Sequence, residues 1–260
     1  MPAFYAHYRF GKMALEQFPP SVRQSISRFR RLYDMGLQGP DFFFYFNPFF
    51  STSTGDLGPK YHKQPGQEFF AQCCAQANSE AAKVYLYGLL GHYVLDSNCH
   101  PFVNAMTKSG QATHVGLEAE FERYLLEMDG LKPAYCQDYS SKIRLTRGEC
   151  VTVSGFFPPA SPTAVWFSFR MMSLVYKFLN QKNRPRAEKI MSSAKKELVD
   201  ILIPMEPVEK YARMDSELLA RFNRVLKLYP QMLQQLQQHM ETGEPLGEDF
   251  LPSFDPEPQE

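Results

Sequence analysis

The sequence has few features that would assign it to a specialised class of protein. Its 260 residues hold 28 Lys and Arg against 28 Asp and Glu, so net charge predicts no capture of nucleic acid or of an anionic membrane. The longest apolar run, 84–95, contains His92 and falls well short of the roughly 20 residues that span a bilayer. With 44% hydrophobic and 22% charged residues, the composition excludes a disordered, collagen-like or disulfide-built chain.

Cysteine is present without any metal or disulfide pattern. The five cysteines form no C-x-x-C pair, and two of them are adjacent: Cys73, Cys74, Cys99, Cys136 and Cys150. An odd number of this kind is typical of buried thiols in a reducing compartment. Residues 1–13 also lack the apolar segment and cleavage site of a secretory signal. We therefore expect a soluble, cytoplasmic protein.

Helical periodicity dominates the chain and predicts an all-α fold, with a single helical domain over residues 1–240. Ser79 has the residue type and position of an N-cap. Glycine and proline predict a loop over 36–50, and weak alternation predicts a short hairpin over 143–153. Helices are expected at 3–18, 21–35, 68–77, 79–98, 113–128, 162–181, 186–202 and, with an interruption, 206–238.

The two ends of the chain differ in charge. No Lys or Arg follows Lys227, so residues 1–227 hold all 28 cations against 21 acids, a net charge of +7. Residues 241–260 hold four prolines and seven acids and are predicted to form a loose acidic tail. The neutral total thus combines a basic body with an acidic tail, and a basic body favours an anionic phosphate substrate.

Histidine is scarce, but five of the six lie within the first 114 residues. His92, Asp96 and His100 are spaced at i, i+4 and i+8, so a helix would place them on one face. Imidazole and carboxylate are the usual ligands of zinc and related metals. Because Pro101 disfavours helical geometry at the preceding residue, we expect His100 to lie at the end of that helix.

A second pair at helical spacing, His114 and Glu118, opens the next predicted helix. A lone histidine on an apolar face is most often a core residue, but burying this many ionisable groups without a cation would be costly. The sequence therefore predicts a site for two or three zinc ions. The candidate ligands are His7, Asp41, His62, His92, Asp96, His100, His114 and Glu118.

These residues, in this order and with the segments HYVLDSNCH and HVGLE, resemble the zinc-dependent phospholipase C family of bacteria. The fungal single-strand-specific zinc nucleases are more distant relatives. The resemblance covers about residues 1–128. It implies an all-α fold with three zinc ions in a cleft.

The resemblance also implies a ligand set for each ion. The first zinc would take Asp41, His62, His92 and Asp96. The second would take His100, His114 and Glu118, and the third would take His7 with Asp96 as a bridge. Asp41 also corresponds to the carboxylate proposed as general base.

Two departures from the family pattern stand in the sequence. The secreted enzymes complete the third zinc with an N-terminal Trp, whereas this chain begins Met1-Pro2. They also have a longer gap than four residues between the bridging Asp and the next His, here Asp96 and His100.

The predicted function is a zinc-dependent hydrolase of phosphate esters, a phospholipase C-like phosphodiesterase in which the metals activate water. The substrate would be a phosphate ester such as a phospholipid. One alternative is a single-strand nuclease or nucleotidase, under which nucleic acid would be the substrate. Another is a catalytically inactive, metal-stabilised helical protein that binds a partner. No pattern predicts a particular protein partner, and the Phe-rich stretch 42–50 favours core packing over an acyl-chain wall.

Overall fold

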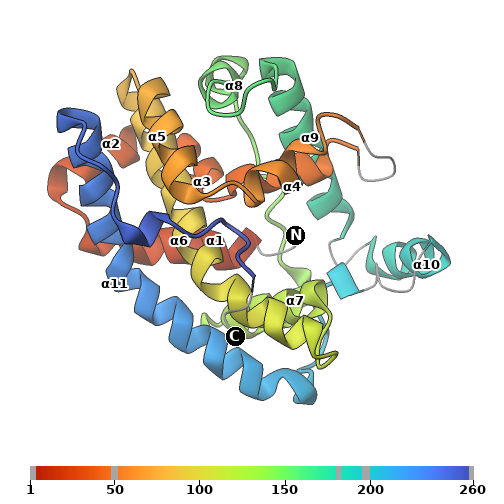
Figure 1. Cartoon of the computed structure of the whole chain (residues 1–260). Helices are drawn as coiled ribbons and strands as arrows, with labels where there is room; N and C mark the ends of the chain where they lie inside the picture. Colours follow the sequence, from red (N-terminus) through yellow and green to blue (C-terminus); the bar gives the residue numbers. More distant parts are fainter. Residues whose placement is uncertain (1–3, 48–51, 180–182, 195–199, 258–260) are drawn as a thin grey trace.

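The structure, a computed structural model, describes residues 4–47, 52–179, 183–194 and 200–257 (Figure 1). Within these ranges the chain is helical and has no strand, which confirms the predicted all-α class. The α-helices are α1 (Phe4–Ala14), α2 (Pro20–Arg28), α3 (Arg30–Gly36), α4 (Leu57–His62), α5 (Gly66–Gln76), α6 (Glu80–Lys108), α7 (His114–Met128), α8 (Arg147–Ser154), α9 (Pro162–Phe178), α10 (Arg184–Ala194) and α11 (Ala212–Thr242). The 3-10 helices are η1 (Leu15–Gln17), η2 (Gly39–Tyr45), η3 (Ala134–Cys136), η6 (Glu209–Tyr211) and η7 (Glu248–Phe250).

Helix α6 is the centre of the fold and is surrounded by α1, α3, α7 and α11 (Figure 1). It is buried along most of its length, from Ala82 to Val103. Helix α3 crosses it so closely that a Cβ on Gly88 would lie 2.2 Å from the carbonyl oxygen of Tyr33. Glycine at this crossing therefore allows the two backbones to touch, which ties the N-terminal helices to the helix that carries the predicted ligands.

The prediction that the helix would end near His100 is wrong, because α6 runs through Pro101 to Lys108. The proline removes one N–H from the helix, but packing on several sides holds the turn in place. Arg221 of α11 donates to the carbonyl oxygen of Asn98, in the turn before the proline, at 3.2 Å. Ser79 caps the start of α6 as predicted, accepting from the backbone N–H of Ala82.

Other boundaries also differ from the expectation. The predicted hairpin over 143–153 is wrong: a capping box of Thr146 and Glu149 begins helix α8 there. The predicted loop 36–50 contains the 3-10 helix η2, and the helix expected over 21–35 divides at Phe29. Helix α11 continues through Pro230 without the expected interruption, because its apolar face stays buried on both sides of the proline.

The C-terminal segment is packed over its described part, which ends at Glu257, so the prediction of a loose tail is wrong there; residues 258–260 lie outside the described residues. Leu246, Phe250 and Phe254 belong to the same hydrophobic core as the N-terminal helices. The backbone N–H of Gly66 donates to the carbonyl oxygen of Pro252 at 2.9 Å. Figure 1 shows this blue segment crossing the middle of α6. Glu244, Glu248, Asp249 and Glu257 are exposed, whereas Leu246, Phe250 and Phe254, spaced four apart, face the core.

All five cysteines are free thiols, as expected, and Cys73, Cys99 and Cys150 are buried. Burial raises the pKa of Cys99 to about 12, so its thiol is inert near neutral pH. Among the helices that the structure describes, none has the length and apolar character needed to cross a bilayer.

Candidate metal centre

The first group of predicted ligands meets where α6, η2 and α4 come together. The Nε2 atom of His62 lies 2.9 Å from Oδ1 of Asp41, and Nε2 of His92 lies 3.0 Å from Oδ2 of Asp96. The four residues offer ligand atoms that all lie within 4.8 Å of one another, and all four are buried. Two imidazoles and two carboxylates at this spacing could hold one metal ion.

The second group lies one turn further along α6. The Nε2 atom of His100 lies 3.3 Å from Oε1 of Glu118, and Nε2 of His114 lies 3.1 Å from the same oxygen. These three residues form a second set of atoms that could hold an ion. The helical geometry at His100, which Pro101 was expected to prevent, places this histidine on the same face as Asp96.

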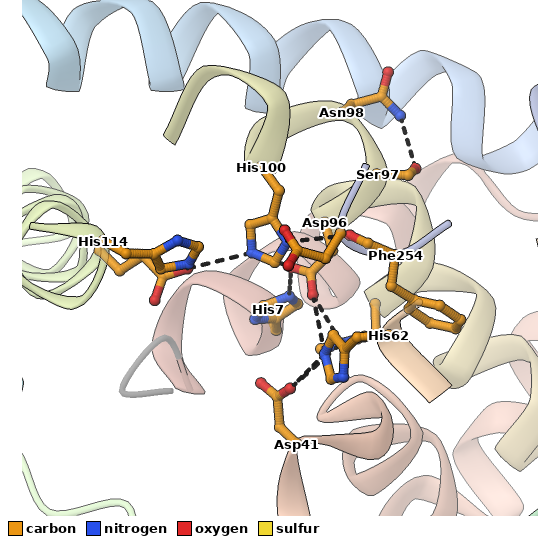
Figure 2. A network of polar contacts seen from close by, with 12 residues as sticks. His7, Asp41, His62, Asp96, Ser97, Asn98, His100, His114 and Phe254 are labelled. Carbon is orange, nitrogen blue, oxygen red and sulfur yellow. Dashed lines mark hydrogen bonds and ion pairs between the residues drawn. The ribbon is translucent and has the colours of Figure 1, made fainter. Parts of the chain in front are cut away.

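Asp96 lies between the two groups, as Figure 2 shows. Its Oδ2 faces His92, whereas its Oδ1 lies 3.6 Å from Nε2 of His100 and accepts from His7 at 2.9 Å. The ring of His7 stacks on that of His92 with centroids 4.4 Å apart. Among the described residues His7 belongs to neither ligand group, so a third ion stays a prediction.

A glycine explains how η2 brings Asp41 to the site. Gly39 has a φ of 49°, a left-handed conformation that disfavours side chains. A Cβ on Gly39 would lie 2.1 Å from the ring of His92, so the chain can pass only because no side chain is present. Two residues later Asp41 faces the cluster, which the resemblance to the family implied and helical periodicity could not show.

Both predicted ligand histidines of the first group hold their other ring nitrogen on a backbone carbonyl oxygen. Nδ1 of His62 donates to the carbonyl oxygen of Gly58 at 2.8 Å, and Nδ1 of His92 donates to that of Leu37 at 3.2 Å. A carbonyl can only accept, so the proton sits on Nδ1 and the lone pair of the neutral ring is on Nε2. This outer arrangement is typical of metal-binding histidines.

Five of the atoms that could bind a metal have no hydrogen-bond partner. Buried atoms without a hydrogen bond include Oδ1 of Asp41, Nε2 of His62, Nε2 of His92, Oδ2 of Asp96 and Oε2 of Glu118. Leaving buried polar atoms unsatisfied costs roughly 1–3 kcal/mol each, and more where they are charged. The unsatisfied atoms converge, and their chemistry is that of zinc ligands, so the residues present fit the metal.

Without a metal, the cluster balances its charge through protons. Burial alone would lower the pKa of His100, but Asp96 and Glu118 outweigh it and raise that pKa to about 10. Burial alone would raise the pKa of Glu118, but His114 and His100 outweigh it and lower it to about 2. Asp96 and Asp41 likewise have pKa values held below their ordinary range by adjacent histidines, against the effect of burial. A divalent cation would therefore displace protons as it binds.

A sequence model of the family described as "Zinc dependent phospholipase C" matches residues 6–154, which is more than half of the chain. The chain belongs to the zinc-dependent phospholipase C family. The comparisons with curated proteins and with solved structures found no significant match. All eight predicted ligands lie within the matched region, whereas α9, α10, α11 and the C-terminal segment lie outside it.

The first part of the Phe-rich stretch beside Asp41 is core, as the sequence favoured, whereas its residues 48–50 lie outside the described ranges. Phe42 and Phe43 are fully buried, and Phe42 stacks on Phe169 of α9 with centroids 4.4 Å apart. Phe44 is only half-buried, and its ring lies 5.4 Å from that of His62. The stretch therefore fixes η2 against α9 and presents one aromatic ring to the cluster.

Sequence reasoning missed one buried acid in this member of the zinc-dependent phospholipase C family. Glu122 extends the row of His114 and Glu118 on α7 by one more turn, the same i, i+4, i+8 spacing as on α6. Neither of its carboxylate oxygens accepts a hydrogen bond in good geometry from a described residue. Burial raises the pKa of Glu122 to about 8, and the nearby Tyr5 backbone N–H and His7 offset this only partly.

The pKa of Glu122 in the folded state, about 8, exceeds its unfolded value of 4.5, so the native state holds the proton more tightly between these two pH values. The free energy of unfolding therefore declines as pH rises from 4.5 to about 8. Glu122→Gln mimics the protonated side chain. In the metal-free protein we expect this variant to gain stability over the wild type as pH rises, by on the order of 2 kcal/mol at pH 8. Urea unfolding at pH 5 and pH 8 measures the difference.

Glu120→Gln is the matched control for this prediction. Glu120 lies on the same helix but pairs with Arg123 through two hydrogen bonds of 2.9 and 2.7 Å. The same change there removes one of the two carboxylates that pair with the buried guanidinium, the other being Glu127 at 2.8 Å, and should destabilise the protein. If both substitutions lowered the free energy of unfolding equally, Glu122 would have a charged partner as Glu120 does, and the prediction would be wrong.

Proposed function

We propose that this protein is a zinc-dependent phosphodiesterase of the phospholipase C type. It would hydrolyse a phospholipid-like phosphodiester to a phosphomonoester and an alcohol. The observation that carries the proposal is the pair of buried ligand groups that meet at Asp96, in a chain of the zinc-dependent phospholipase C family. A cytoplasmic location is part of this proposal.

We assign one zinc ion to each group: one to Asp41, His62, His92 and Asp96, and one to His100, His114 and Glu118. When bound, zinc makes water acidic enough to attack near neutral pH and neutralises negative charge on phosphoryl and leaving-group oxygens. The chain's part is to hold the ligand atoms in place. Asp96 shares its two oxygens between the groups, which keeps them at a fixed separation.

We assign Asp41 as the group that holds the attacking water and takes its proton. Its Oδ1 is buried 2.9 Å from Nε2 of His62, and the carboxylate has lone pairs left to accept a hydrogen bond from a water molecule at the cluster. Burial acts to raise the pKa of Asp41, but His92 and His62 outweigh it and hold it below its ordinary value. The carboxylate is therefore ionised throughout the neutral range, as a proton acceptor must be.

The second group is the more open of the two. The side chain of His114 is 24% exposed, compared with 0% for that of His92. A cavity of about 30 Å³ beside Asp96 and Glu118 has room for one or two water molecules. This arrangement supports a substrate phosphate that enters from the side of His114 while water is retained near the deeper carboxylates.

The test is one purified, zinc-loaded sample assayed against soluble short-chain phospholipids with different headgroups, a phosphomonoester and single-stranded DNA. We expect the phospholipid diesters to be hydrolysed and the other two to react at least about tenfold more slowly. Preferential cleavage of DNA would replace the proposal with the nuclease alternative. A zinc-loaded sample that hydrolyses none of them would favour the inactive binding protein.

A further inference from the structure

The C-terminal segment lies directly behind the second ligand group. Nδ1 of His100 donates to the carbonyl oxygen of Phe254 at 3.0 Å, and Oδ1 of Asp255 lies 3.5 Å from the same nitrogen. This places the proton on Nδ1 and directs Nε2 of His100 at Glu118. A segment some 150 residues away in sequence thus holds this ligand in the orientation and tautomer that a metal requires.

The same segment also orients His114, through the side-chain amide of Asn104. The side-chain nitrogen of Asn104 donates to Oδ1 of Asp255 at 2.7 Å and to the carbonyl oxygen of Pro256 at 3.2 Å. With its nitrogen fixed in this way, the amide turns its oxygen to Nδ1 of His114, 3.2 Å away. An oxygen can only accept, so Nδ1 carries the proton and Nε2 faces Glu118.

The segment is anchored by contacts that do not involve the Asp255 side chain. The Tyr93 hydroxyl donates to the carbonyl oxygen of Pro252 at 2.8 Å, and the backbone N–H of Asp255 donates to that of His62 at 3.1 Å. The ring of Phe254 is buried and lies near those of His62 and His92, which Figure 2 shows for His62. The Asp255 side chain, by contrast, is 38% exposed. Changing it should therefore leave the segment in place.

We propose that the C-terminal segment 253–256 is the outer shell of the second metal group, with Asp255 as a positioning residue. Asp255 acts on His114 through Asn104 and directly on His100. The segment lies beyond the part of the chain that matches the family, so this is a feature of this chain and not of the matched region. The inference rests on the metal sites of the proposed function, but it requires no activity.

The experiment is a metal titration of the metal-free, full-length protein, with Co²⁺ absorbance for geometry and Zn²⁺ competition for affinity. A His114→Ala variant identifies which of the two affinities belongs to the second group. For Asp255→Ala, which removes the acceptor of the Asn104 amide, we expect the second-group dissociation constant to rise about 10–100-fold with the first-group constant unchanged. Glu257→Ala is the matched control, because it makes the same truncation at an exposed acid two residues away.

An exchange of the two side chains separates positioning from a general structural effect. Asn104→Asp alone puts two carboxylates together and should weaken the second site similarly. The double variant Asn104→Asp/Asp255→Asn restores a donor opposite an acceptor and keeps an oxygen toward His114, so it should recover most of the affinity that Asn104→Asp loses. If Asp255 and Asn104 only stabilised the fold, exchanging them would not restore the metal affinity of the second group.

The inference would be overturned if Asp255→Ala bound two metals as tightly as Glu257→Ala, or if the double variant bound the second metal no more tightly than Asn104→Asp. Equal weakening of both sites, with a lower melting temperature of the metal-free protein, would also overturn it. Because no substrate is present, a protein that binds two ions as expected but hydrolyses nothing would contradict the proposed function and leave this inference standing.

Discussion

Replacing Asp96 with Ala is expected to remove both metal ions and to lower hydrolysis by at least about 1000-fold. Asp96 is the residue that faces both ligand groups, with Oδ2 3.0 Å from His92 and Oδ1 3.6 Å from His100. Its loss removes a carboxylate from the charge balance of both groups, so each keeps two imidazoles and a single carboxylate and binds a divalent ion more weakly. Metal catalysis supplies several kcal/mol of transition-state stabilisation, which corresponds to this factor in rate.

Metal content and activity should be measured on the same sample of Asp96→Ala, with circular dichroism as the check on folding. Asp96→Asn keeps the volume of the side chain and guards against a variant that fails to fold. Asp249→Ala is the control, because that acid lies on the surface. An Asp96→Ala protein that kept two ions and full activity would show that the cluster is not the catalytic centre.

Removal of metal by a chelator is expected to lower the melting temperature of the wild type by about 15–30 °C. A ligand present at 1000 times its dissociation constant stabilises the native state by about 4 kcal/mol per site. In a domain of this size each kcal/mol corresponds to roughly 2–4 °C. Buried carboxylates and imidazoles without an ion must instead be balanced by protons, which compensate only in part.

The decrease in melting temperature on chelation should grow as pH rises above neutrality. In the metal-free protein the pKa of His100 is raised to about 10 by Asp96 and Glu118, against the opposing effect of burial. Protonated His100 therefore contributes stability that is complete below about pH 6.5 and disappears as pH rises toward 10. Calorimetry at pH 7 and pH 9, with and without chelator, measures the decrease in melting temperature at each pH. The Asp96→Ala variant is the control, since a protein that binds no metal should not respond to the chelator.

The ligand row on α6 could be predicted because its spacing equals the repeat of a helix. The N-caps that open α6 and α7, Ser79 and Thr113, also have the residue types that local hydrogen bonding favours. Helical spacing alone could not place Asp41 and His62, which η2 and α4 bring to the cluster. Their inclusion rested on the resemblance to the family, and Gly39 shows the steric reason for the position of η2.

The misjudged elements were those in which tertiary packing overrides local preference. Pro101 and Pro230 stand inside long helices because the surrounding helices hold each turn. Composition made the C-terminal residues look like a solvated tail, although Leu246, Phe250 and Phe254 are spaced four apart. Those three residues carry the segment into the core, and its role behind the second ligand group depends on contacts that no local pattern encodes.

The central claim, that each of the two ligand groups holds one metal ion, is tested most directly by anomalous diffraction at the zinc edge from crystals of the zinc-loaded protein. The account predicts one peak among Asp41, His62, His92 and Asp96, and a second among His100, His114 and Glu118. Zinc bound only elsewhere on the protein, or no anomalous peak at either group, would contradict it.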